Sequence, residues 1–113
     1  MKVLEKVVVV KVVMVIEKVV EATRPKTAAD HFREVTELMA QTFERKNKDY
    51  GNTTAQMYKQ YGQTYYNIMI EQKLNRIKAI TAQNSENYES VEDSLLDLAN
   101  YAILAILDRR EQL

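Results

Sequence analysis

The sequence predicts an all-α protein built as a bundle of helices. Two glycines and one proline among 113 residues leave little material for β-turns. Apolar residues recur at three- and four-residue steps over residues 27–46 and 63–82, which is the period of an amphipathic helix. Residues 90–107 are apolar almost all round, which favours a helix at the centre of the bundle. A chain of this length buries only a modest core, so we expect a homo-oligomer.

The first segment, residues 1–25, is rich in valine. The β-branched runs Val7–Val10 and Val12–Ile16 favour a strand, whereas the lack of any turn signal inside the segment favours a helix. We predict a helix and keep the strand as the alternative. We assign this segment to packing or oligomerisation, and residues 26–113 to one helical domain. No apolar run approaches the ~20 residues that a bilayer requires, so we expect no membrane partner.

A helix is predicted to begin after the break at residues 24–26. Thr27 is followed three residues later by Asp30, as in a capping box. The apolar stripe of this helix extends to about Lys46, and it consists of Ala28, Phe32, Val35, Leu38, Met39 and Phe43. His31, near the helix start, is predicted to lie at the surface.

The polar run 46–52 is predicted to form a loop. Gly51 suits the left-handed residue that ends a helix. Lys48, Asp49 and Tyr50 gather polar side chains at this point, and such clusters on loops are reasonable ligand contacts.

After a connecting segment with one or two helical turns, Gly62 marks a bend and a third strong helix is predicted over residues 63–82. Its inward residues are Tyr66, Met69, Ile70, Leu74, Ile77 and Ile80. Lys73 and Arg76 lie three residues apart, so they can point the same way and hold phosphate oxygens. Ordinary surface charge is the alternative reading of this pair. Residues 83–90 are predicted to form a polar loop.

The last helix carries acids on an apolar background. Asp93, Asp97 and Asn100 follow at i, i+4 and i+7 and share one stripe, with Glu92 beside the first of them. Asp93 also fits a capping box with Ser90, but Asp97 lies too far along the helix to cap it. A buried carboxylate without a partner is costly, so cations, donors or a metal ion are expected near Asp97.

Composition excludes several classes of function. Lys plus Arg and Asp plus Glu both number 16, so no basic field gathers nucleic acid in bulk. The chain has no cysteine, which excludes disulfides and thiolate metal sites and fits a reducing, cytoplasmic location. With a single histidine, carboxylates and amides are the plentiful ligands. Mg²⁺ or Mn²⁺ is therefore the natural ion if a metal is present.

Four motifs carry a resemblance to a known family. They are residues 46–52 (Lys-Asn-Lys-Asp-Tyr-Gly-Asn), 73–77 (Lys-Leu-Asn-Arg-Ile), 89–93 (Glu-Ser-Val-Glu-Asp) and 96–102 (Leu-Asp-Leu-Ala-Asn-Tyr-Ala). In this order the chain resembles small phage and prophage proteins called nucleotide-modification-associated, which look like MazG-like all-α NTP pyrophosphohydrolases. The resemblance covers roughly residues 30–108. It implies a MazG-like helical bundle that assembles as a dimer or tetramer, in the host cytoplasm if the protein is phage-encoded.

The resemblance also implies a Mg²⁺-dependent hydrolase that splits a nucleoside triphosphate or modified nucleotide into monophosphate and pyrophosphate. Asp97 stands at the Asp of the family's second acidic motif. The implied metal and catalytic residues are Glu92, Asp93 and Asp97, and Glu37 or Glu44 can face them across a groove. The implied nucleotide contacts are Lys48, Lys73 and Arg76 to phosphate, and Asp49, Tyr50 and Asn100 to base or sugar.

Two departures from the family pattern keep other functions open. Ser94 stands where a MazG-type protein has Glu, and Gln72 stands where relatives carry an acid. One alternative is a catalytically inactive protein that sequesters a signalling or cyclic nucleotide in counter-defence. The other is a structural helical oligomer, in which the acids and bases form salt bridges between helices.

Overall fold

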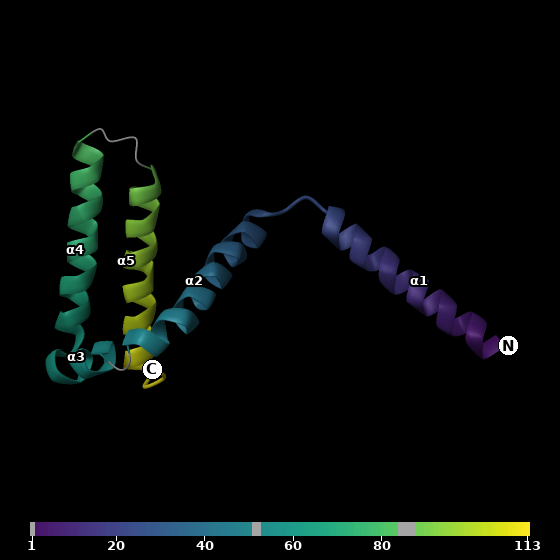
Figure 1. The fold of residues 1–113 in the computed structure, drawn as a ribbon, viewed down its shortest axis with the longest axis horizontal. Helices are drawn as coiled ribbons and strands as arrows, with labels where there is room; N and C mark the ends of the chain where they lie inside the picture. Colours follow the sequence, from purple (N-terminus) through teal and green to yellow (C-terminus); the bar gives the residue numbers. More distant parts are fainter. Residues whose placement is uncertain (1, 51–52, 84–87) are drawn as a thin grey trace. The chain divides into compact units, whose positions relative to one another are not determined.

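The computed structural model of the protein describes residues 2–50, 53–83 and 88–113, and for residues 48–50 and 88–89 it describes only the backbone. The described residues form five helices. The helices are α1 (Lys2–Thr23), α2 (Ala28–Tyr50), α3 (Thr53–Tyr61), α4 (Gln63–Ala82) and α5 (Tyr88–Arg109) (Figure 1). Every regular element in these ranges is a helix, so the all-α prediction is confirmed. The strand alternative for the valine-rich segment is wrong, because this segment forms α1. No helix in the described ranges is long and apolar enough to cross a membrane.

The chain divides into two compact units, one ending at Thr36 and one running from Glu37 to Leu113, and each is described by itself. In the first unit, the predicted capping box starts α2. The backbone N–H of Thr27 donates to Asp30 Oδ2 at 2.9 Å, and the N–H of Asp30 donates to Thr27 Oγ1 at 3.1 Å. These two bonds satisfy groups that a helix N-terminus leaves without intrahelical partners. His31 is exposed, as predicted.

The helix α2 extends further than the sequence predicts. The helix continues through the polar run to Tyr50, so residues 46–50 are helical and the loop prediction is wrong for them. Polarity alone does not end a helix, since lysine is a good helix former. The predicted stop at Gly51 agrees with the observed end of α2, although Gly51 itself lies outside the described residues.

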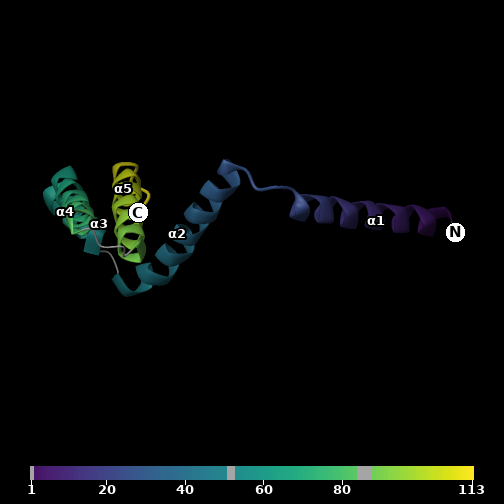
Figure 2. The same ribbon diagram turned by 90° about the horizontal axis from the view of Figure 1, so that it is seen from above.

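In the second unit, α3 leads through Gly62 into α4, and α4 packs along α5. Gly62 has φ 67°, a left-handed conformation that side chains disfavour, and this conformation turns the chain between the two helices. The predicted bend and the predicted helix 63–82 are thus both confirmed. The helices α4 and α5 lie side by side in both views (Figures 1 and 2).

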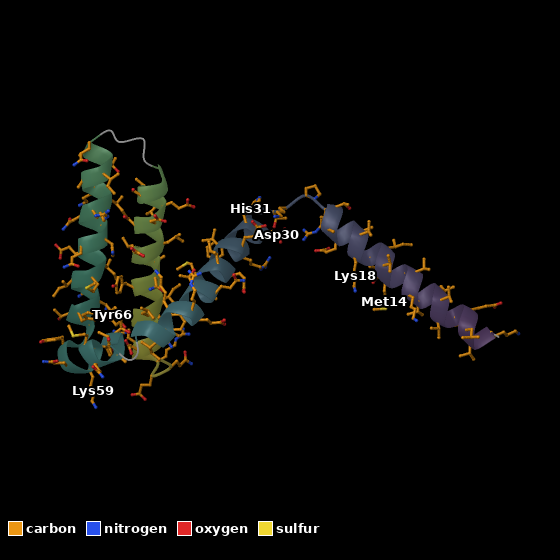
Figure 3. The ribbon with its side chains drawn as sticks, in the orientation of Figure 1. Met14, Lys18, Asp30, His31, Lys59 and Tyr66 are labelled. Carbon is orange, nitrogen blue, oxygen red and sulfur yellow. The ribbon has the colours of Figure 1, made fainter. Side chains whose placement is uncertain are left out.

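The helices α4 and α5 form a helical hairpin. Its core is small and lies at the end where α4 begins and α5 ends. Its buried residues are Tyr66, Leu104 and Ala105. The hydroxyl of Tyr66 donates a hydrogen bond to Asp108 Oδ2 on α5. The Tyr66 ring also meets the ring of Tyr65 edge-on, with centroids 5.0 Å apart. Tyr66 was predicted to face inward, and it lies on the early turns of α4 (Figure 3).

The last helix is less enclosed than its composition predicts. Three large apolar side chains of α5 are 42–51% exposed, namely Leu95, Ile103 and Ile106. Leu74 on α4, predicted to face inward, is exposed as well. A helix with apolar residues on every side needs neighbours all round. Within the described chain, α5 makes its extensive helix contact with α4 alone, so the predicted central position is wrong for a single copy.

Candidate functional site

An ion pair joins α4 and α5 at the acid that the sequence singles out. Lys73 Nζ lies 3.1 Å from Asp97 Oδ2. The Asp97 side chain is 49% exposed and that of Lys73 is 26% exposed. The expectation that Asp97 is deeply buried is therefore wrong. The expectation of a cation beside it is confirmed, and Lys73 is that cation.

Asp97 also lines a cleft between α2 and α5, within the second unit. The cleft has a volume of about 130 Å³ and is lined by Leu38, Met39, Thr42, Leu96, Asp97 and Asn100. Its walls are mostly apolar, and three of the six lining side chains are polar, namely Thr42, Asp97 and Asn100. Whole small-molecule sites occupy about 300–1,000 Å³, so this cleft has room for part of a ligand such as a flat ring.

Helix periodicity explains which predicted residues meet at the cleft. Asp97 and Asn100 are three apart on α5, so both reach the same face, as predicted. Glu92 and Asp93 are exposed on the same helix and do not line the cleft. Arg76 is exposed on α4, one turn after Lys73. Ser94, at which the sequence departs from the MazG-type pattern that it resembles, is 3% exposed and thus buried.

Glu37 and Glu44, the two acids of α2 that the sequence places across a groove from Asp97, do not line the cleft with it. Glu37 is exposed and accepts a hydrogen bond from Gln41 Nε2 at 3.3 Å. Glu44 lines a separate, shallow depression on α2. Among the residues that the structure describes, no three histidine, aspartate or glutamate side chains gather as metal ligands. One described copy thus brings a single acid, Asp97, to the cleft.

Three further predicted contacts lie at the end of α2. Lys48, Asp49 and Tyr50 belong to the last turn of α2, but their side chains lie outside the described residues. Their assignment to phosphate, base or sugar stays a prediction.

Sequence reasoning missed Thr42 as a polar group of the site. Thr42 follows Leu38 by four residues, and Met39 is three residues before it, so the three share one face of α2. A threonine within an apolar stripe was the available signal, but nothing in the sequence indicates that this stripe faces Asp97.

Comparison with known proteins supplies the family. The model of the family described as "Nucleotide modification associated domain 1" matches residues 46–108, more than half of the chain. The chain belongs to this family. The match includes the Lys73–Asp97 pair, Arg76 and Asn100, but it leaves out α1 and most of α2. No curated protein and no solved structure matches the chain. The nucleotide-modification resemblance found from the four motifs is therefore confirmed over residues 46–108.

Proposed function

We propose that this member of the nucleotide modification associated family binds a nucleotide beside α5. The observation that supports the proposal is the Lys73–Asp97 ion pair at 3.1 Å, next to a cleft that combines apolar walls with Asn100 and Thr42. Ligand sites commonly combine apolar walls with a few polar groups that fix orientation. A family associated with nucleotide modification makes a nucleotide the natural ligand.

Each part of a nucleotide has a suitable partner here. A base fits between Leu38, Met39 and Leu96, because its faces are flat and apolar. The amide of Asn100 both donates and accepts, so it can recognise the edge of a base or a sugar hydroxyl. Lys73 and Arg76 are one turn apart on α4 and carry the positive charge that phosphate oxygens require.

Mg²⁺-dependent hydrolysis of a nucleoside triphosphate is the second candidate. The described copy offers no three-ligand site, so its residues do not fit a resident ion held by protein alone. They do fit an ion that arrives with the nucleotide, because Mg²⁺ is commonly held by one or two carboxylates together with substrate phosphates. Asp97 would supply such a carboxylate. The MazG-like relation and a phage source rest on the resemblance of the four motifs.

The test is a nucleotide-binding screen by calorimetry and thermal shift, with and without Mg²⁺. A ligand that binds the folded state raises the melting temperature. Lys73→Met should weaken binding of a triphosphate at least tenfold, since a charge-assisted contact contributes about 1.5–3 kcal/mol. Lys78→Met is the matched control, because Lys78 is an exposed lysine of the same helix outside the ion pair.

A charge-swapped variant separates binding from a purely structural ion pair. Lys73→Asp combined with Asp97→Lys can restore the ion pair but moves the cation from α4 to α5. We expect the melting temperature to be retained and nucleotide binding to be lost. If no nucleotide binds the native protein, the structural reading of the pair replaces our proposal. Release of pyrophosphate that needs Mg²⁺ and fails in Asp97→Asn supports hydrolysis, whereas return of intact ligand supports sequestration.

A further inference from the structure

The helix α1 has an apolar surface that no described residue of its own unit covers. Its thirteen large apolar side chains, between Val3 and Val20, are 43–73% exposed, and none of its described residues is buried. Met14 and Lys18 project from the helix (Figure 3). Monomeric soluble proteins rarely expose contiguous apolar patches larger than a few hundred Å², so a surface of this kind indicates a partner.

The charges of α1 indicate the orientation of that partner along the helix. At about 100° per residue, Lys2, Lys6, Glu17 and Glu21 fall within one sector of the helix about 100° wide. The two lysines occupy its N-terminal half and the two glutamates its C-terminal half. Val10 and Val13 lie in the same sector between them, so the middle of the sector is apolar.

The order of charges in this sector is unfavourable for a helix on its own, although Glu5 in the first turn of α1 is favourable. The N-terminal end of a helix is the positive end of its dipole and favours acids, while the C-terminal end favours bases. Glu21 has a local partner, since Arg24 Nη2 lies 2.9 Å from its Oε1. The described ion pairs involve neither Lys6 nor Glu17. A neighbouring helix running the opposite way would offset both the dipole and the charges.

We propose that α1 pairs with α1 of a second copy in antiparallel orientation, with facing residues whose numbers sum to 23. This alignment brings Lys6 level with Glu17 and Lys2 level with Glu21, all within the facing sector. Glu5 and Lys18 are also level with each other but lie outside that sector. Val10 is level with Val13, and Val3 is level with Val20, and all four lie in the same sector. Of the seven charged residues of α1, only Lys11 is level with an apolar residue. A two-fold axis makes every contact occur twice, as in other isologous interfaces.

The pair Lys6 and Glu17 gives the sharpest test. The two residues are eleven positions apart, or about 16 Å along one helix, so they cannot touch within one copy. Lys6→Glu and Glu17→Lys should each raise the dimer dissociation constant about three- to tenfold in sedimentation experiments at low salt, because two exposed ion pairs are lost. The double variant should return to within about twofold of the native value. Lys11→Glu is the control and should change it less than about twofold.

Disulfide cross-linking tests the orientation, since the native chain has no cysteine that would interfere. Val3→Cys and Val20→Cys place single thiols near opposite ends of the sector. Mixing the two variants should give a mixed cross-link, while neither variant alone forms one through α1. Self-cross-linking of Val3→Cys would indicate a parallel pair and overturn the proposal. A protein that stays monomeric, or a double variant that is not rescued, would also overturn it.

Discussion

The helix α1 and the α4–α5 hairpin are both rich in apolar residues but use them differently. The thirteen large apolar side chains of α1 are all exposed. The hairpin buries Tyr66, Leu104 and Ala105, and it joins its two helices by polar contacts that end on Asp97 and Asp108. The difference teaches that apolar composition supplies a tendency to associate, whereas specific pairs of residues decide which surfaces meet.

The largest effect that separates the two regions is expected from truncation of Tyr66. Tyr66→Ala removes the only side chain in the described residues that is both large and fully buried. Truncations of large aromatic residues in cores cost about 3–5 kcal/mol of unfolding free energy. Val13→Ala in α1 is the matched control and should change it by less than about 0.5 kcal/mol in the dilute monomer, because Val13 is exposed.

Urea unfolding followed by circular dichroism measures this difference. A loss below about 1 kcal/mol in Tyr66→Ala would mean that the hairpin core is not where the second unit derives its stability. The contrast between α1 and the α4–α5 hairpin would then be wrong.

A smaller effect is expected from removing only the hydroxyl of Tyr66. Tyr66→Phe keeps the ring and deletes the hydrogen bond to Asp108, a loss of about 1.5–3 kcal/mol for a bond to a charged group. Burial and this hydrogen bond raise the pKa of the Tyr66 hydroxyl well above its usual value of 10.0. The hydroxyl stabilises the folded state fully below pH 10, and this stabilisation is lost as the pH rises above 10.

The alkaline limb of the stability curve checks this prediction. Native protein should lose more unfolding free energy between pH 9 and pH 11 than Tyr66→Phe loses over the same range. Equal losses would assign the alkaline transition to other groups, such as Tyr65, whose pKa is also raised by burial.

The sequence predicts local structure well because local structure depends on neighbouring residues. Residues within a few positions of one another determine the capping box of Thr27 and Asp30, the bend at Gly62 and the helix 63–82. The extension of α2 to Tyr50 was missed, since a polar run of good helix formers can continue a helix as well as end one.

The candidate site depends on contacts between distant residues, which a single sequence predicts less well. Asp97 and Asn100 could be placed together because one helix spacing joins them. The pairing of Lys73 with Asp97 depends on the relative rotation of α4 and α5. The position of Thr42 in the cleft depends on how α2 packs against α5. The helical period predicts neither arrangement. The Tyr66–Asp108 contact, which spans 42 positions, was missed for the same reason.

The smallest effect is expected at the start of α2, where the capping box joins Thr27 and Asp30. Hydrogen bonds from Thr27 lower the pKa of the Asp30 carboxyl below its usual 3.8. A lowered folded-state pKa stabilises the helix above pH 3.8, and this stabilisation is lost as the pH falls through the lower value of the folded state. The helicity of the first turn of α2 should therefore decrease below about pH 4. The backbone amide NMR chemical shifts of residues 28–31 measure this decrease. Asp30→Asn should remove most of this pH dependence, while His31→Gln should leave it unchanged. An unaltered acid transition in Asp30→Asn would show that the carboxyl does not stabilise the helix start.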